Sequence, residues 1–141
     1  MRMLRPWISI LISTAASMAI WWVWHAKGVF RDRWLVSNRI TQAKIDVQVE
    51  SGIGSTIIAT ALTYLVISIG IHYWLDATGS KSLWRALGNA FVLWALIVVP
   101  IVFLDLLWEF RRLDSTVLDS SHLLVVLLSI TVIANRFKRS I

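Results

Sequence analysis

The chain of 141 residues alternates between long apolar runs and shorter polar stretches, and this pattern predicts membrane-spanning helices. A helix needs about 20 apolar residues to cross a hydrocarbon core about 30 Å thick. Four runs come close to that number, and they cover residues 7–24, 55–74, 84–108 and 117–134. We therefore expect an all-α integral membrane protein whose four transmembrane helices form an up-down bundle in a single domain, residues 1–141.

The first run begins after Arg2 and Arg5, and a secretory signal peptide also begins with basic residues. The small residues Ser17 and Ala19 would suit a cleavage site. The apolar run continues to Trp24, however, and the apolar region of a signal peptide is shorter than this. We therefore interpret the first run as a retained membrane helix.

Tryptophan occurs nine times in the chain, and most copies flank an apolar run. The amphipathic indole ring settles at the level of the lipid headgroups, so these positions predict where the helices enter and leave the membrane. The expected interface anchors are Trp7, Trp22, Trp24, Trp74, Trp84 and Trp108.

Two spans contain residues that bear on helix geometry. Pro100 lies in the second half of the third run, where it removes a backbone donor and crowds the preceding turn, so we expect a kink there. In the second run, Thr56, Thr60 and Thr63 recur at three- and four-residue spacing and share one face. Their hydroxyl groups can bond to neighbouring helices or to the preceding turn of their own helix.

The longest polar stretch joins the first two spans. Within it, Ile40, Ala43 and Val47 fall at helical spacing in the segment from Ser37 to Val49. Two interpretations stay open for this segment, a short helix that lies on the membrane surface and a solvated loop.

Composition supports the membrane assignment and narrows the partners. Hydrophobic residues make up 57% of the chain and charged residues only 16%, too few to cover a soluble globule of this size. The net charge is +6, but the basic residues lie beside the spans, so we expect anionic lipid headgroups rather than nucleic acid as their partner. The absence of cysteine excludes disulfides and thiolate metal sites.

The basic residues do not decide the orientation. In a four-span topology, the side with both termini carries seven Lys and Arg residues, and the opposite side also carries seven. We favour cytoplasmic termini because a basic tail directly follows the last span, and insertion in both orientations is the alternative. The two sets are positions 2, 5, 81, 85, 136, 138 and 139, and positions 27, 31, 33, 39, 44, 111 and 112.

One group of polar residues has chemical potential. Asp105 and Glu109 are four residues apart and share a helix face, and Asp119 and His122 are three residues apart and do the same. Antiparallel spans would bring these four residues and His25 to one mouth of the bundle. Such a group could relay protons, bind a cationic substrate or hold a metal such as zinc or iron.

A purely structural interpretation of the same residues stays open. Glu109 can pair with Arg112, and Asp119 falls in the first turn of the fourth run, where a carboxylate favours the helix dipole. Thr116 and Asp119 also have the spacing of a capping box. We expect His72 to lie alone at the opposite membrane interface. No cofactor is predicted, and a metal or haem is kept as an alternative.

Two stretches are similar to patterns of a known family. The first is Trp24-His25 followed by Phe30 and Trp34, which resembles the end of the first span in the domain of unknown function 1761 family. The second stretch is Leu93-Trp94, Pro100 and then residues 108–112. It resembles the family's third span. The chain departs from the family pattern at His25 and at residues 119–122. The resemblance implies a small, mostly bacterial four-helix protein of the inner membrane, and it implies no established activity.

The functional hypotheses follow from these features. We expect an accessory or interaction subunit of a larger membrane assembly, or a homo-oligomer, because the soluble parts are too small for an enzyme domain. Small residues at four-residue spacing permit close helix contacts, either between subunits or inside the bundle. The alternatives are a small proton-coupled transporter or carrier and a metal- or haem-dependent membrane enzyme. The small-residue pairs are Ser13 with Ser17, Ala15 with Ala19, and Ala86 with Ala90.

Overall fold

A computed structural model describes residues 4–80 and 82–139 of the chain. Within these residues, four helical stretches are long and apolar enough to cross a membrane, as the sequence predicted. The helices are α1 (Leu4–Trp24), α4 (Ile53–Ala77), α5 (Leu83–Leu93) with its continuation α6 (Val99–Trp108), and α7 (Leu113–Arg139).

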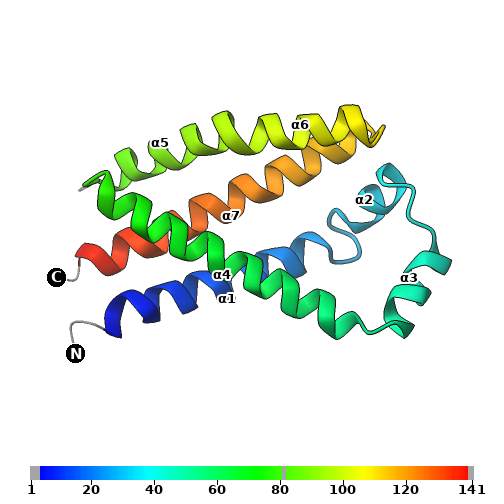
Figure 1. Ribbon diagram of the computed structural model, residues 1–141, viewed down its shortest axis with the longest axis horizontal. Helices are drawn as coiled ribbons and strands as arrows, with labels where there is room; N and C mark the ends of the chain where they lie inside the picture. The colour runs from blue at the N-terminus through cyan, green and yellow to red at the C-terminus, as the bar shows by residue number, and fades with distance from the viewer. Residues whose placement is uncertain (1–3, 81, 140–141) are drawn as a thin grey trace.

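The four spans run up and down, as expected. Figure 1 shows both ends of the chain and the turn between α4 and α5 at one end of the molecule. The two short helices α2 (Arg31–Ser37) and α3 (Gln42–Glu50) lie at the opposite end (Figure 1). The described residues of the tail and the second loop therefore share one face, as the four-span topology requires.

Helix α7 is the centre of the bundle. It packs against α1, α4, α5 and α6. Helices α4 and α5 each contact α7 more than they contact each other. Of the most apolar part of α7, 44% is buried, against 11% for α4 and 11% for the α5–α6 span. The outer spans therefore present most of their apolar surface to the surroundings, which fits contact with a lipid bilayer.

The core forms where α4, α5 and α7 meet, and α1 closes it from the side. Leu75, Val126 and Ile130 are the largest apolar side chains with no meaningful exposure. Ala86 and Ala90 of α5 are also buried, so their small side chains serve contacts inside the bundle.

Small residues on α1 point in two directions. Ser13 and Ser17 are fully buried, so they too serve contacts inside the bundle. Ala15 and Ala19 are exposed on the outside of the same helix. Of the three pairs with four-residue spacing, this is the one left for contacts outside the chain.

Two of the three threonines of α4 bond to their own helix. The hydroxyl of Thr60 donates to the carbonyl of Thr56 at 2.8 Å, and Thr63 donates to Ala59 at 2.9 Å. For Thr60 and Thr63 these bonds select the second sequence interpretation, a bond to the preceding turn of their own helix. Thr56 differs, because its hydroxyl accepts from the side chain of Gln48 on α3 at 2.9 Å.

The third span contains an irregular turn next to Pro100. Residues Trp94–Val98 form a wide π-helical turn, labelled η1, between α5 and α6. Proline cannot donate to the carbonyl one turn earlier, and a wide turn accommodates both the lost donor and the bulk of the ring. The sequence predicted a kink at Pro100, and the irregular turn that the structure contains ends two residues before this proline.

The start of α7 corrects one sequence interpretation. We expected the fourth span to begin near Val117, but the helix begins at Leu113. Asp119 therefore lies in the second turn, and Asp114 is the carboxylate in the first turn. Thr116 is inside the helix, where its hydroxyl reaches the Arg112 carbonyl at 3.4 Å, so the capping-box interpretation was wrong.

The first loop is helical in two places. Helix α3 covers most of the segment from Ser37 to Val49, so the helical interpretation of this segment was right. None of the α3 side chains is buried in the chain's own fold. Helix α2 was not predicted, and it packs against α7.

Candidate functional site

The two histidines of the predicted cluster are in contact. The His25 and His122 rings lie edge to face with centroids 5.7 Å apart, at the end of the bundle that carries the first loop. The Nδ1 atom of His25 donates to the Trp21 carbonyl at 2.9 Å, which leaves its Nε2 free of any bond to the described residues. On the other side, the Tyr64 hydroxyl lies 3.4 Å from Nε2 of His122. Three spans, α1, α4 and α7, therefore meet at this pair.

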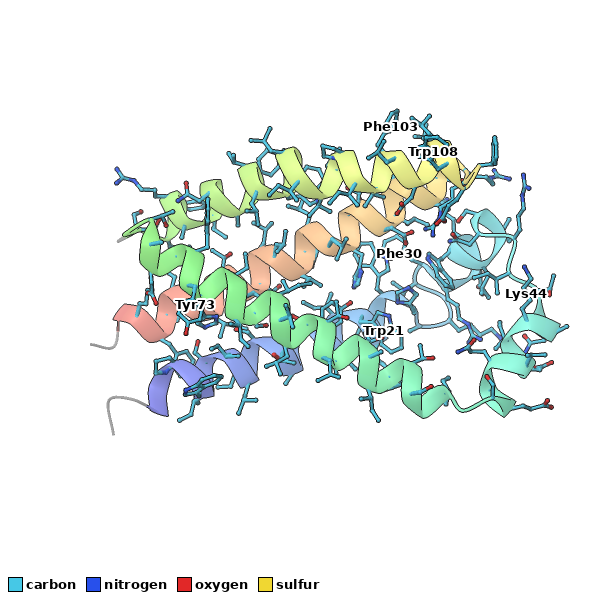
Figure 2. All side chains as sticks on the ribbon, in the orientation of Figure 1. Trp21, Phe30, Lys44, Tyr73, Phe103 and Trp108 are labelled. Atoms are coloured by element: carbon cyan, nitrogen blue, oxygen red, sulfur yellow. The ribbon has the colours of Figure 1, made fainter. Side chains whose placement is uncertain are left out.

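Aromatic rings surround the histidine pair. Trp24 packs against His122 with centroids 5.5 Å apart, and Trp34 meets His25 edge-on at 5.1 Å. Phe30 packs on Trp24 with ring centroids 4.4 Å apart. Figure 2 shows Phe30 and Trp21 in the region where the first loop meets the spans. The aromatic residues of the first family-like stretch therefore form the wall around the histidines.

Asp119 is held by two donors. The indole Nε1 of Trp34 donates to one carboxylate oxygen at 3.0 Å, and an Nη atom of Arg111 reaches the other at 3.4 Å. Arg111 also binds Glu109 through its Nε at 2.6 Å, so it bridges two of the predicted carboxylates. The expected partner of Glu109 was wrong, because Glu109 lies beyond the end of α6 and Arg112 pairs instead with Asp114.

The bond from Trp34 to Asp119 is part of a two-rung ladder between α2 and α7. The second rung is the Ser115 hydroxyl, which donates to the Asn38 side-chain oxygen at 2.8 Å. Each rung is four residues from the other on both helices, so matched turns of antiparallel helices face each other. The amide of Asn38 also donates to the Trp34 carbonyl at 2.9 Å. The ladder fixes the first loop to the start of the central helix.

Asp105 is the predicted site residue with the fewest bonds. Its carboxylate is half-buried on α6 and close enough to Asp119 for the two charges to interact. Its side chain has no hydrogen bond or ion pair with the residues that the structure describes. The structure therefore brings His25, His122, Asp119 and Glu109 into one contact network, and places Asp105 beside it.

The arrangement bears on metal binding. Across residues 4–80 and 82–139, no group of three or more His, Asp or Glu side chains is arranged to hold a metal ion. The carboxylate of Asp119 already accepts from two donors. One nitrogen of each histidine has a protein partner, a carbonyl for His25 and a hydroxyl for His122. One donor is left over, since the buried Nε1 of Trp24 has no partner among the described residues. A hydrogen-bond acceptor is the chemistry that this atom lacks.

His72 was expected to be solitary, and this was wrong. It is buried at the opposite end of the bundle, where its Nδ1 donates to the Ser68 carbonyl at 2.7 Å. That bond leaves Nε2 as the acceptor of the neutral ring, and the Ser9 hydroxyl of α1 donates to it at 2.8 Å. An ion pair of 2.6 Å between Lys138 and Asp76 lies at the same end and joins α7 to α4.

An apolar groove runs along the outside of α7. It lies between α4 and the α5–η1 segment, and its volume is about 400 Å³. Gly70 forms part of the α4 wall, and no atom of another helix lies within 4 Å of the place that a β-carbon would occupy there. The other lining residues are Ile67, Ile71, Trp74, Leu93, Val98, Leu123, Val126 and Leu127.

The contact network around His25, His122, Asp119 and Glu109 is called the polar cluster below. Sequence reasoning missed several of its members. Trp34 and Arg111 stood in the two family-like stretches, but neither was assigned to Asp119. Trp94 of the second stretch donates its Nε1 to the Ser120 carbonyl at 2.8 Å. Both stretches therefore dock on the same turn of α7. The two family-like stretches and the polar residues 119–122 were the available signal in the sequence for this cluster. Nothing in the sequence pointed to Tyr64.

The comparisons agree with the resemblance found in the sequence. Residues 8–135 match the family described as "Protein of unknown function (DUF1761)". No curated protein and no solved structure matches the chain. The matched region includes most of each of the four spans and both stretches that dock on α7. The chain therefore belongs to the DUF1761 family of proteins of unknown function.

Proposed function

We propose that this protein is an interaction subunit of a larger membrane assembly, and that the groove over α7 receives an apolar transmembrane helix of a partner subunit. The observation that carries the proposal is the groove itself, which the chain's own helices leave open along the central helix. Because α4 and α5 both lean on α7, a guest helix between them would complete the packing around it.

The wall of the groove favours a helix over a lipid chain. Small residues at membrane interfaces let two helix backbones approach closely, and Gly70 supplies such a position on α4. A flexible lipid tail fills an apolar groove without any need for a small residue. Charged residues are absent from the lining, so the guest helix would present apolar side chains to the groove.

A single substitution with a matched control tests the proposal. Leucine at Gly70 would project into the groove, whereas leucine at Gly88 would lie on an exposed face of α5 that is outside the groove. Both changes raise helix propensity by a similar amount. The tagged full chain and both variants would be purified from native membranes in a gentle detergent, and the intact complexes weighed by native mass spectrometry.

The proposal requires a stoichiometric foreign subunit on the wild-type protein and on Gly88→Leu, and its loss from Gly70→Leu. Retention of that subunit by Gly70→Leu would remove the groove as the contact surface. A wild-type protein that occurs only as copies of itself would contradict a heteromeric assembly.

A second candidate function is a proton-coupled carrier, which the free carboxylate of Asp105 favours. An ionisable group inside a span is a candidate for proton or cation binding when it has no partner of its own. The Asp105→Asn variant would abolish a pH-dependent flux in liposomes, with Asp46→Asn on the exposed helix α3 as the control. An equal flux in wild type and Asp105→Asn would eliminate this candidate.

For the location, we propose a bacterial inner membrane with both termini in the cytoplasm. The support is the basic tail after the fourth span together with the shared face of the two termini. Since the chain has no native cysteine, single cysteines at Lys44 and Lys138 would report sidedness directly. Labelling of Lys138→Cys from outside intact cells would overturn this orientation.

A further inference from the structure

A second cavity, a hollow of about 640 Å³ that is largely open to the surroundings, lies at the junction of α2 and the start of α7, on the same end as the polar cluster. Its charged members are Arg33 from α2 and the pair formed by Arg112 and Asp114. Its apolar members are Leu113, Val117 and Leu118 of α7. Neither the polar cluster nor the groove over α7 shares a lining residue with it.

The two guanidinium groups have unused donors. Arg33 is exposed and has no side-chain partner in the part of the chain that the structure describes. Arg112 binds Asp114 through its Nε at 3.1 Å, so its terminal nitrogen atoms remain available. Two arginines and one aspartate give the lining a net charge of +1. Arginine presents planar donors that match the oxygens of a phosphate.

The apolar wall continues from these charges toward the membrane. Val117 lies four residues beyond Leu113 along α7, which is roughly 6 Å deeper at the rise of an α-helix. Trp108 and Phe110, which precede this helix, are 81% and 84% exposed. Figure 2 shows Trp108 on the outer side of the bundle near this end. Exposed aromatic rings of this kind mark the headgroup level of a bilayer.

We propose that this cavity binds an anionic phospholipid, with its phosphate on Arg33 and Arg112 and the start of an acyl chain along Leu113 and Val117. The first turn of α7 contributes favourably, because the positive end of the helix dipole lies at the same place. Asp114 opposes the anion, but it also holds the Arg112 side chain at the cavity. The ligand class follows from cationic donors at headgroup level above an apolar wall.

Binding to the purified full chain in a non-ionic detergent tests the proposal by native mass spectrometry. The probes are dimyristoylphosphatidylglycerol, the zwitterionic phosphatidylcholine with the same chains, and glycerol 3-phosphate without chains. Each basic residue near a membrane surface contributes about 1 kcal/mol toward an anionic lipid, so the two arginines should give a preference of about ten-fold or more. We expect one phosphatidylglycerol per chain and weaker binding of the other two probes.

Two variants separate the charges from the apolar wall. Arg33→Gln combined with Arg112→Gln should remove the preference for phosphatidylglycerol, whereas Lys27→Gln combined with Lys44→Gln should keep it. Both double variants remove two positive charges from the same end of the bundle, but neither Lys27 nor Lys44 lines the cavity. Val117→Trp should weaken lipid binding while it keeps all charges, and it carries the test if the arginine variant does not fold.

Three outcomes would overturn the inference. An equal loss in the lysine variant would show only general attraction of anions to this end. Glycerol 3-phosphate that binds as tightly as the lipid would make the cavity a site for a free phosphate compound. Unchanged lipid binding in Val117→Trp would show that no acyl chain lies against α7. A failure of the partner helix to bind in the groove would leave this inference untouched.

Discussion

The two ends of the bundle each bury a histidine, and they use it differently. At the end with the termini, both ring nitrogens of His72 have short partners, Ser9 at 2.8 Å and the Ser68 carbonyl at 2.7 Å. At the end with the first loop, His122 has one distant hydroxyl at 3.4 Å and three aromatic or histidine neighbours. The His72 ring is satisfied in its hydrogen bonds, whereas the surroundings of His122 retain unused donors and acceptors.

This difference indicates separate roles for the two ends. A buried ring with two good hydrogen bonds fixes the contact between α1 and α4, because loss of either bond leaves a polar atom without a partner. A ring with weak bonds, a neighbouring histidine and an unpaired indole nitrogen of Trp24 can take up a further group at little cost. Any response to a ligand or proton is therefore expected at the end with the first loop.

The largest effect on stability should come from His72→Leu. Leucine is close in size to histidine, but it leaves the Ser9 hydroxyl and the Ser68 carbonyl without their side-chain partner. This loss should lower the free energy of unfolding by about 2 kcal/mol. Tyr73→Leu, at the exposed neighbouring position, is the control. Thermal unfolding in detergent measures both. Equal unfolding midpoints for the two variants would show that the hydrogen bonds of His72 do not fix the contact between α1 and α4.

A smaller and local effect is expected from Asp119→Leu. The change leaves the Trp34 indole and Arg111 without their acceptor, so the ladder between α2 and α7 should weaken by about 1–2 kcal/mol. Hydrogen exchange of residues 31–37 should accelerate, whereas that of α4 should not. Asp119→Asn keeps an oxygen for Trp34 and should give a smaller acceleration. Unchanged exchange in Asp119→Leu would mean that the ladder does not hold the loop.

The smallest effects compare single oxygen atoms at the two ends. Ser9→Ala removes the short bond to His72 and should lower stability by about 1 kcal/mol. Tyr64→Phe removes the 3.4 Å contact with His122 and should change stability by less than about 0.5 kcal/mol. Chemical unfolding in mixed micelles would rank the two variants. The reverse ranking would contradict the contrast between the ends.

The sequence predicted which residues of the candidate site lie together, but not which partners its carboxylates bind. The spacing of Asp119 and His122 and the antiparallel order of the spans predicted that they would meet His25, and the rings do meet. The partners of the carboxylates were not predictable in the same way. Glu109 was assigned to Arg112 from helical spacing, but the helix ends before Glu109, so the spacing does not apply there.

The sequence by itself determined the four spans, their up-down order and the family, because burial in a bilayer requires long apolar helices whose length can be counted. Only the tertiary structure decided which small residues face inward, how α2 docks on α7, and that His72 is bonded to Ser9. Most side chains of these membrane helices are apolar on the inward and the outward faces alike, so the sequence carries little of the polar and apolar alternation that orients a helix in a soluble protein. The orientation of each helix is set by side-chain packing between helices far apart in the chain.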